Sequence, residues 1–380
     1  PQYSPPMPRT IRGPFPAVAI PPPEFHPDAR TTWERMLADA AGARKRLWIE
    51  NYILEDGEAA EALLRAIQAA RANGAEVRVL LDDFGSMYLS DDFIERLADS
   101  GAILKRYNPV QWLKMPWVGF SRYARRTHRR ILVVDQKLVW TGGIAFSDRW
   151  WPFDDECEIR DAMIRAEGEL VGQFALAFDE LWSGERLPSP QKYPPAREGE
   201  ARCLVQHPGK GWRLNRELRR ALADARHRVW IATPYFIPPR KLRRALRHSA
   251  RMGVDVRLLL PGARRHDHPA VRFASRRYYY RLLRAGIRIF EYQPTFQHAK
   301  VALLNEAHSV VGSANLDRWS WLHNHEIILA AHSRPLAAEI ESWFEREFEQ
   351  SKEILIEDWV KRSLLARLAE RFFGLFDRWF

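Results

Sequence analysis

The chain of 380 residues repeats one order of sequence patterns in its two halves. In each half, a strand pattern that contains a tryptophan precedes a helical pattern, an apolar run, a second helical pattern and another strand pattern. Residues at equivalent positions are Trp48 and Trp230, Gly74 and Gly253, and Gly101 and Gly286. Equivalent sequence patterns form equivalent supersecondary structure, and the repeat therefore predicts two units of similar fold.

Strand patterns that alternate with amphipathic helical patterns indicate layers of helix and sheet. The runs at 77–81 and 256–260 are short and continuously apolar, which is typical of central strands covered on both faces. The predicted fold class is therefore α/β, with two pseudo-twofold-related repeats. Each repeat is expected to be a helix-flanked mixed β-sheet, with a shared active site at the interface between the halves.

Changes in composition give the expected domain boundaries. Residues 1–24 are rich in proline and predict an extended N-terminal arm. The first repeat is expected at 25–182 and the second at 205–350. Residues 183–204 combine proline with charge and lack periodicity, which predicts a linker. Residues 351–380 carry apolar side chains at helical spacing opposite basic ones, which predicts an amphipathic helical tail.

The chain is basic, with 59 lysines and arginines against 48 aspartates and glutamates, and a formal charge of +11. A spanning helix needs an apolar stretch of about 18 residues, and the sequence has none, so any membrane association is expected at the surface. Cys157 and Cys203 are too few for a disulfide framework and too far apart for a zinc pair. This cysteine usage favours a reducing compartment.

Each repeat ends with a histidine followed two residues later by a cation, His128 with Arg130 and His298 with Lys300. In an extended strand, residues two apart point to the same face. If the repeats pack about a pseudo-twofold axis, two imidazoles and two cations meet at one site that suits a phosphodiester. One such motif beside an apolar strand often arises by chance, whereas two at equivalent positions favour catalysis.

The expected chemistry explains these residue types. One imidazole attacks phosphorus and forms a phosphohistidine, and the other protonates the alkoxide that leaves. Arg130, Lys300 and Asn315 would stabilise negative charge on the non-bridging oxygens. This scheme requires neither a metal nor another cofactor.

These motifs resemble the signature of the phospholipase D superfamily, in which H-x-K-x4-D is followed by a glycine turn with a nearby asparagine. The segments LLDDFGS, YYYRLLRAGIRIFEYQPTFQHAKVALL and VGSANLDRWSWLHNHE are similar to bacterial cardiolipin synthases, especially the shorter form without paired transmembrane helices. The resemblance runs from about Phe25 to the C-terminus.

The resemblance implies roles for further residues. Asp161 and Glu326 would hold the two imidazoles in the correct tautomer. Ser313 would join Asn315 in binding phosphate. The family's habit makes His128 the nucleophile and leaves the acid role to the second histidine, although the residues by themselves do not decide between the two.

Asp135 and Asn305 occupy the position of the family's aspartate and are expected to support the motifs. Three positions depart from the family pattern. Arg130 replaces lysine, Asn305 replaces aspartate, and Ala145 stands where the first turn usually has asparagine. Arginine keeps the charge but differs from lysine in shape and hydrogen bonding.

The segment 110–127 interleaves aromatic residues with cations just before the first histidine. Rings at headgroup depth beside cations are typical of a bilayer interface. Trp112, Trp117 and Phe120 are therefore predicted to form a membrane lip, and the alternative is a segment packed in the core. For the tail, an interfacial helix, a helix docked on the protein's own core and an oligomer contact all remain open.

The resemblance implies a phosphatidyltransferase that moves a phosphatidyl group from one phosphatidylglycerol to another and releases glycerol. The expected partners are anionic phospholipids, phosphatidylglycerol and cardiolipin, with peripheral contact at the cytoplasmic face of the bacterial inner membrane. The alternatives are a hydrolytic phospholipase D, a nuclease of the same superfamily, and a catalytically weakened protein that binds anionic lipid. An apolar lip disfavours nucleic acid. The oligomeric state stays open.

Two clusters contain potential metal ligands, His266-Asp267-His268 and His323-x-His325. Isolated pairs of this kind in loops are usually solvated or structural rather than ligating. The sequence therefore predicts no metal site.

Overall fold

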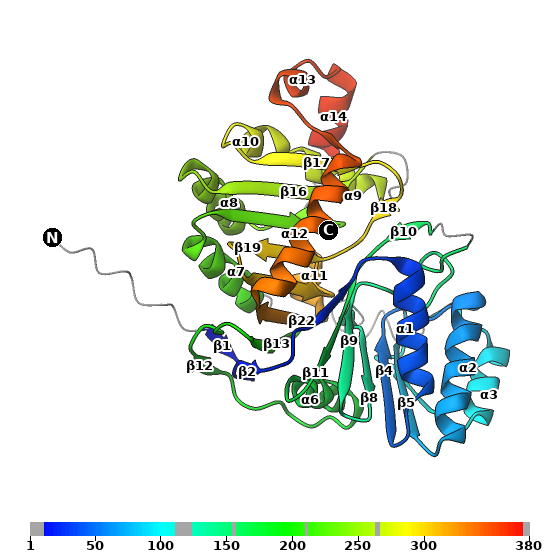
Figure 1. The fold of residues 1–380 in the computed structure, drawn as a ribbon. Coiled ribbons are helices and arrows are strands. Elements are labelled where there is room, and N and C mark those ends of the chain that lie inside the picture. Colours follow the sequence, from blue (N-terminus) through cyan, green and yellow to red (C-terminus); the bar gives the residue numbers. More distant parts are fainter. Residues whose placement is uncertain (1–10, 111–123, 154–156, 210–211, 263–266, 375–380) are drawn as a thin grey trace.

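The computed structural model describes residues 11–110, 124–153, 157–209, 212–262 and 267–374. Figure 1 shows two β-sheets, each flanked by helices, with the first half of the chain in blue to green and the second half in green to red.

The first sheet contains seven strands in the order β3-β11-β9-β8-β4-β5-β6. Neighbours β4, β5 and β6 are parallel, and the remaining pairs are antiparallel. The elements of this half are β3 (Glu24–His26), α1 (Ala29–Ala41), β4 (Arg46–Asn51), α2 (Glu58–Ala72), β5 (Glu76–Asp82), α3 (Asp91–Asp99), β6 (Ile103–Tyr107), β8 (Ile131–Val134), β9 (Leu138–Gly142), β11 (Met163–Glu167) and α6 (Leu170–Trp182).

The second sheet contains the path β22-β20-β19-β14-β16-β17, which has the same order and directions as β11-β9-β8-β4-β5-β6. The predicted α/β repeat is thus confirmed. The elements of this half are β13 (Glu200–Gln206), α7 (Trp212–Asp224), β14 (Arg228–Ala232), α8 (Arg240–Arg251), β16 (Asp255–Pro261), α9 (Pro269–Arg276), α10 (Tyr279–Leu283), β17 (Arg288–Tyr292), β19 (Val301–Leu304), β20 (His308–Gly312), α11 (Arg318–His323), β22 (Asn324–His332), α12 (Arg334–Glu349) and β23 (Ser351–Glu353).

Short strands connect these units. They are β1 (Ile11–Gly13), β2 (Val18–Ala19), β7 (Arg126–Thr127), β10 (Ile159–Arg160), β12 (Gln191–Tyr193), β15 (Phe236–Ile237), β18 (Phe296–Gln297) and β21 (Leu316–Asp317).

Alternate residues of the central strands face different cores, as strand geometry requires. Val133 and Val301 lie in a core that both halves share with α6 and α12. Leu132 faces a core of the first half under α1, α2 and α3. Leu304 faces a core of the second half under α7, α8 and α10. Because both faces of each sheet are covered, the apolar runs of the strands are continuous.

Local sequence sets several helix ends. The side chains of Ser90 and Ser333 accept backbone N–H groups at the starts of α3 and α12, as N-caps do. Gly74 and Gly253 follow α2 and α8 with φ of 89° and 87°. Glycine adopts this left-handed conformation at low cost, which explains why it ends the equivalent helices of both halves.

Two segments outside the repeats are more structured than their composition predicts. Within the expected N-terminal arm, β1 pairs with β12 and β2 pairs with β13. The expected linker, 183–204, contributes β12 and most of β13, and β13 pairs along its length with β22. Short strands at sheet edges, such as β1, β2 and β12, tolerate proline and charge, and β13 carries charged residues as well, so composition concealed these strands.

The tail forms two short helices, α13 (Ile356–Val360) and α14 (Leu364–Phe373), instead of one. Trp359 is buried against Tyr279, with ring centroids 4.9 Å apart. The apolar side chains of Leu364, Leu368 and Phe372 on α14 are 74%, 58% and 55% exposed. The start of the tail thus docks on the protein, whereas α14 presents an apolar stripe to solvent. No helix within the described ranges is long and apolar enough to cross a membrane.

Candidate active site

Short strand pairings between the two halves set the positions of the two histidines. β7 pairs in parallel with the start of β22, and the His128 N–H donates to the carbonyl of His325 (3.0 Å). β10 pairs in parallel with β18, and the His298 N–H donates to the carbonyl of Arg160 (2.7 Å). The backbone next to each histidine is therefore held by the other half of the chain.

The first imidazole is oriented by a carboxylate from the second half. Nδ1 of His128 lies 3.1 and 3.0 Å from the two carboxylate oxygens of Glu326. A carboxylate only accepts hydrogen bonds, so Nδ1 carries the hydrogen and Nε2 keeps its lone pair. A guanidinium nitrogen of Arg130 lies 3.3 Å from this Nε2 and also donates to the His128 carbonyl (3.0 Å).

The second imidazole is oriented by a carboxylate from the first half. Nδ1 of His298 lies 2.6 Å from Oδ2 of Asp161. Nζ of Lys300 lies 2.9 Å from Nε2 of the same ring and donates to the His298 carbonyl (2.7 Å). In both motifs the orienting carboxylate comes from the other half of the chain and the cation reaches Nε2 and the carbonyl of its histidine. The second motif differs in that Nζ of Lys300 also lies 2.7 Å from Nδ1 of His298.

Further hydrogen bonds fix the orientation of both carboxylates. The hydroxyls of Ser313 and Ser320 donate to Glu326 at 2.5 and 2.6 Å. Nε1 of Trp150 donates to Asp161 (3.0 Å). Ser313 is fully buried, and its hydroxyl donates to Glu326 and accepts the backbone N–H of Ile327 (3.0 Å), so its contacts are those of a positioning residue rather than of a phosphate ligand.

Gly143 occupies the position equivalent to Ser313 in the first half. A Cβ atom at Gly143 would stand 2.0 Å from a carboxylate oxygen of Asp161. The site therefore requires glycine there, because the carboxylate fills the space of a side chain.

Burial and neighbouring charges keep both imidazoles neutral. Burial lowers the pKa of His298 to about 3, with Lys300 adding to the effect. Burial also lowers the pKa of His128, and Glu326 opposes this shift. Burial would raise the pKa of Asp161, but Lys300 and His298 hold it well below its usual range. A neutral imidazole whose Nε2 keeps its lone pair is suited to attack an electrophile.

Both cations of the motifs are buried. Arg130 is 1% exposed and Lys300 is 6% exposed. Burial lowers the pKa of Lys300 to about 7, and although Asp161 opposes the shift, Arg130 contributes to it. Two adjacent buried cations favour an anion between them, because a bound negative charge would offset their repulsion.

The two imidazoles line one cavity with an empty volume of about 1420 Å³, part of which is open to solvent. Asn315 also lines it, and its side-chain oxygen has no partner within the described ranges. The remaining lining residues come from both halves and include Tyr52, Arg126, Arg149, Trp150, Tyr235, Asp317 and Trp319. The arrangement provides a nucleophile, a proton donor and cations around one space.

Asp135 and Asn305 occupy equivalent turns with φ of 51° and 53°. The Asp135 carboxylate accepts the backbone N–H groups of residues 44, 45 and 46 at 2.7–3.1 Å. The Asn305 side-chain oxygen accepts those of Arg226 and His227 at 2.8 and 3.2 Å. An amide oxygen thus makes the same kind of contact as the carboxylate, which accounts for asparagine at this position.

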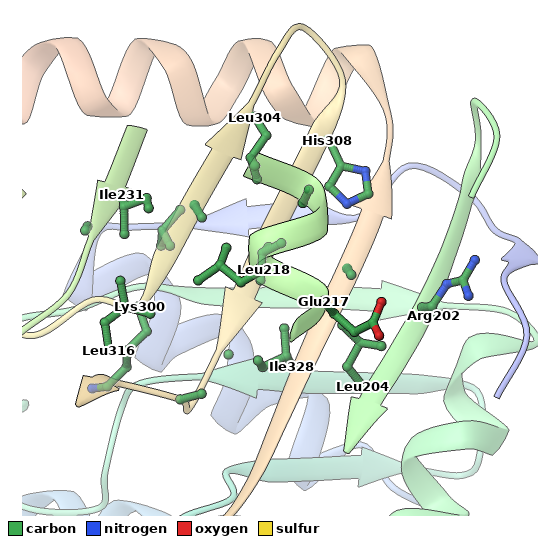
Figure 2. A pocket seen from close by; sticks show the side chains of 18 of the residues that line it. Arg202, Leu204, Glu217, Leu218, Ile231, Lys300, Leu304, His308, Leu316 and Ile328 are labelled. Carbon is green, nitrogen blue, oxygen red and sulfur yellow. The ribbon is translucent and has the colours of Figure 1, made fainter. Parts of the chain in front are cut away.

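A second cavity lies between α7 and the second sheet, with an empty volume of about 910 Å³ that is partly open to solvent. Its walls are mostly small and apolar, with Ala302 and Ala330 on the sheet. Figure 2 shows Lys300 at one side of this cavity and Arg202 at the other. The cavity therefore begins beside a cation of the candidate active site.

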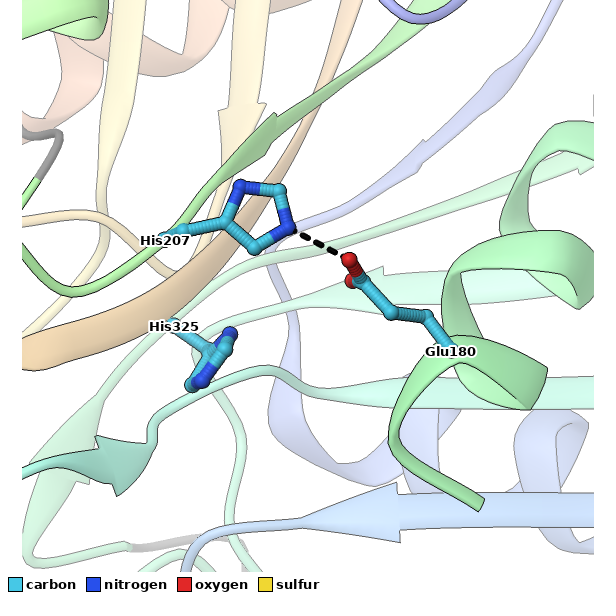
Figure 3. A group of neighbouring side chains, drawn as sticks. All are labelled: Glu180, His207 and His325. Carbon is cyan, nitrogen blue, oxygen red and sulfur yellow. Dashed lines mark hydrogen bonds and ion pairs between the residues drawn. The ribbon is translucent and has the colours of Figure 1, made fainter. Parts of the chain in front are cut away.

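The histidine pair at 323 and 325 does not converge on one point. His323 packs on Trp319, with ring centroids 4.4 Å apart. His325 instead lies near Glu180 and His207 (Figure 3), and one potential ligand atom of each lies within 4.8 Å of the others.

These three donors already have protein partners. Glu180 bonds His207 (2.6 Å) and Arg129 (2.7 Å), and His325 bonds the hydroxyl of Tyr107 (2.9 Å). The guanidinium beside Glu180 opposes a cation at this place. We therefore interpret the group as a hydrogen-bond network next to Glu326.

The sequence did not identify Trp150 and Ser320, which hold the two orienting carboxylates. Each follows its small-residue turn by the same number of residues, so the repeat contained a signal for both. The predicted lip residues Trp112, Trp117 and Phe120 lie outside the described residues.

Comparison with known proteins identifies the family. Residues 36–182 and 218–348 match the family described as "Cardiolipin synthase, PLD-like domain". The chain is 32% identical over 356 residues to cardiolipin synthase A of Pseudomonas entomophila, covering 90% of this chain and 72% of that protein. It is 30% identical over 349 residues to cardiolipin synthase of Geobacillus kaustophilus, covering 89% and 68%.

Solved structures share the fold. Phosphatidylserine synthase of Haemophilus influenzae superposes with a TM-score of 0.76 at 15% identity, covering 96% of this chain and 95% of that chain. Polyphosphate kinase of Porphyromonas gingivalis gives a TM-score of 0.54 at 15% identity, covering 85% and 49%. From the family match and the relatives together, the chain belongs to the cardiolipin synthase family of phospholipase D-like phosphatidyltransferases.

Proposed function

We propose that the protein makes cardiolipin by transferring a phosphatidyl group from one phosphatidylglycerol to another through a phosphohistidine. The observation that carries this proposal is the matched pair of histidine motifs. In each, Nδ1 is bonded to a carboxylate from the other half, Nε2 lies beside a cation, and both rings line one cavity.

In the first step, Nε2 of His128 attacks the phosphorus of phosphatidylglycerol. A P–N bond forms, the P–O bond to the headgroup glycerol breaks, and the protonated His298 gives its proton to the departing alkoxide. The bound diester is an anion and raises the low pKa of His298, which enables that ring to carry the proton. Arg130, Lys300 and Asn315 would hold the non-bridging oxygens.

In the second step, a hydroxyl of another phosphatidylglycerol attacks the phosphohistidine. The P–N bond breaks, a new P–O bond forms, and neutral His298 takes the hydroxyl proton. One phosphodiester replaces another, so the reaction consumes no nucleotide. Water would give phosphatidic acid instead, and synthesis therefore depends on keeping water out of the cavity.

The apolar cavity beside Lys300 has the properties needed for part of an acyl chain. Lys300 lines this cavity and also contacts His298, so a lipid whose phosphate is held at Lys300 would place a chain along the apolar walls under α7. Burying methylene groups there is favourable by about 0.8 kcal/mol each.

Two exposed apolar surfaces support peripheral contact with an anionic membrane. Phe84 and Tyr88 are 45% and 75% exposed in the loop after β5, and Arg126, which lines the active-site cavity, lies over the Phe84 ring. The exposed stripe of α14 lies beside Arg367 and Arg371 on the same helix. Apolar side chains next to cations bind the interface of anionic bilayers. The proposed location is the cytoplasmic face of the bacterial inner membrane.

The test is incubation of the protein with vesicles of phosphatidylglycerol alone, followed by mass spectrometry of the lipids. Cardiolipin with equimolar glycerol supports the proposal. Phosphatidic acid as the main product would indicate a hydrolytic phospholipase D. Vesicle binding without any new lipid would indicate a lipid-binding protein, and cleavage of a supplied oligonucleotide would indicate a nuclease. Loss of product in both His128→Ala and His298→Ala is required by the two-imidazole scheme.

A further inference from the structure

Helix α8 concentrates positive charge on the outer surface of the second half. It contains seven basic residues among its 12 and no acidic residue. Together with α10 it forms a groove of about 520 Å³ empty volume, which is partly open to solvent. The groove is lined by Arg240, Arg243, Arg244, Arg247, Tyr278, Arg281 and Leu282. Among the described residues, five guanidinium groups thus surround this space and no carboxylate lines it.

This arrangement is unfavourable for the protein alone. Like charges one helical turn apart, such as Arg240 and Arg244, destabilise a helix. Cations in the first turn also oppose the helix dipole. Within the described ranges, Arg240, Arg244, Arg247 and Arg281 make no ion pair. Burial and the surrounding arginines lower the pKa of Arg247.

The equivalent groove of the first half is charge-balanced and provides an internal control. Counted back from Gly74 and Gly253, Glu61 corresponds to Arg240 and Gln68 to Arg247. Glu61 lines the first groove and binds Arg96 with two hydrogen bonds of 3.0 and 2.7 Å.

Arg96 in turn corresponds to Arg281, counted back from Gly101 and Gly286. In the second half, the carboxylate of this ion pair has therefore become a further arginine. The same fold forms both grooves, so packing alone does not require the cluster.

We propose that the groove between α8 and α10 is a phosphate-binding site separate from the active site. It shares no lining residue with the cavity that contains the histidines. Guanidinium groups bind phosphate oxygens in bidentate fashion, and several around one groove fit a group with more than one phosphate charge. The source is either the headgroup of an anionic phospholipid or a soluble phosphate compound, and both supply the same chemistry.

The test uses inorganic pyrophosphate as the probe and calorimetry of the full chain as the readout. Arg240→Glu copies the first half and should weaken pyrophosphate binding by about tenfold or more. It should also raise the melting temperature, since the introduced carboxylate can pair with Arg281 as Glu61 pairs with Arg96. Arg247→Gln, which copies Gln68, should weaken binding without adding an ion pair. Arg65→Glu on α2 makes the same change of net charge and should bind as the unmodified protein does.

Vesicles distinguish the source of the phosphate. If Arg240→Glu also loses binding to phosphatidylcholine vesicles that contain phosphatidylglycerol, the ligand is a lipid headgroup. Since α14 and the loop after β5 are also proposed to bind vesicles, the ligand is soluble if the vesicle affinity of Arg240→Glu equals that of the unmodified protein while pyrophosphate binding is lost. Equal pyrophosphate affinity in the unmodified protein, Arg240→Glu and Arg247→Gln would overturn the proposal. The active site is intact in all these variants, so cardiolipin formation in detergent micelles reports separately on the proposed function.

Discussion

His128 is oriented by Glu326, a residue 198 positions away in the other half of the chain, at 3.0 Å. The reciprocal contact joins His298 to Asp161 across 137 positions at 2.6 Å. Neither half therefore contains a complete histidine–carboxylate pair. The strand pairings β7 with β22 and β10 with β18 produce this exchange, because each brings a histidine beside the carboxylate-bearing strand of its partner.

Because each carboxylate orients the histidine of the other half, a variant of the carboxylate should behave like a variant of the histidine that it orients. Glu326→Gln should lower cardiolipin formation by roughly a hundredfold or more, because an amide no longer fixes the tautomer or stabilises a positive imidazole. If His128 is the nucleophile, this variant also loses the phosphoenzyme, as His128→Ala does. Asp161→Asn should impair proton transfer, as His298→Ala does. Rapid quench with labelled phosphatidylglycerol measures the phosphoenzyme.

Glu345→Gln is a matched control on the exposed face of α12 and should retain full activity. A phosphoenzyme that disappears in Asp161→Asn but persists in Glu326→Gln would assign the nucleophile to His298 instead.

Lys300 predicts the alkaline limb of the pH profile. Burial lowers its pKa to about 7, so its charge, and with it the affinity for the diester, falls as the pH rises above this value. We expect loss of the Lys300 charge to steepen the fall of kcat/KM above pH 7 by about a further tenfold per pH unit, beyond the fall that loss of the His298 proton causes. The effect on kcat should appear at higher pH because the bound anion raises the pKa of Lys300. Lys300→Arg keeps its charge at all these pH values and should lose this additional fall. The same additional fall in Lys300→Arg would contradict the assignment.

The lowered pKa of Lys300 also predicts that the free energy of unfolding depends on pH. The unfolded lysine has a pKa of about 10.4, so between pH 7 and this value the unfolded chain binds more protons than the folded one. The free energy of unfolding should therefore rise with pH over this interval. Urea unfolding at several pH values measures it, with Lys300→Met as the control that removes the dependence.

The repeat predicted most of the fold because its signals are local. Helical periodicity, continuous apolar strands and glycine caps each depend on neighbouring residues, and the two halves corroborated one another. The strands β12 and β13 escaped prediction, since charged residues such as Lys192 and Arg202 interrupt their patterns. The sequence located the two motifs but could not assign each carboxylate to its histidine, because the pairing depends on contacts between distant strands.

Arg130 tests whether the first motif needs arginine. One guanidinium nitrogen reaches Nε2 and the carbonyl of His128, and Lys300 makes the same two contacts in the second motif. Arg130→Lys should therefore keep kcat within a few-fold. Arg130→Met, which removes the charge, should lower it roughly a hundredfold. A loss as large in Arg130→Lys as in Arg130→Met would show that the planar guanidinium is required.

Asn305 tests the support of the second motif. Asn305→Ala leaves the backbone N–H groups of Arg226 and His227 without their acceptor, and should lower the free energy of unfolding by about 1–2 kcal/mol. Asn305→Asp should preserve stability at neutral pH.

The expected pH dependence of Asn305→Asp follows from Asp135, which occupies the equivalent turn of the first half. Burial alone would raise the pKa of Asp135, but the hydrogen bonds that its carboxylate accepts from the backbone N–H groups of residues 44–46 lower this pKa. The stabilisation of the folded chain by ionised Asp135 is therefore present above the pKa of an unfolded aspartate, about 3.9. It is lost as the pH falls through the lower pKa that Asp135 has in the folded chain. The new aspartate should show the same acid loss, whereas Asn305 shows none. Urea unfolding across acid pH checks this.

The apolar cavity under α7 predicts a dependence on acyl-chain length. Ala330→Leu would fill part of the space that begins at Lys300 without touching the histidines. If an acyl chain occupies the cavity, KM for long-chain phosphatidylglycerol should rise about tenfold while kcat and the turnover of a short-chain analogue stay unchanged. Ala98→Leu, on the exposed side of α3, controls for added bulk. Equal KM values for both chain lengths in Ala330→Leu, in a variant that is otherwise stably folded, would place the acyl chain elsewhere.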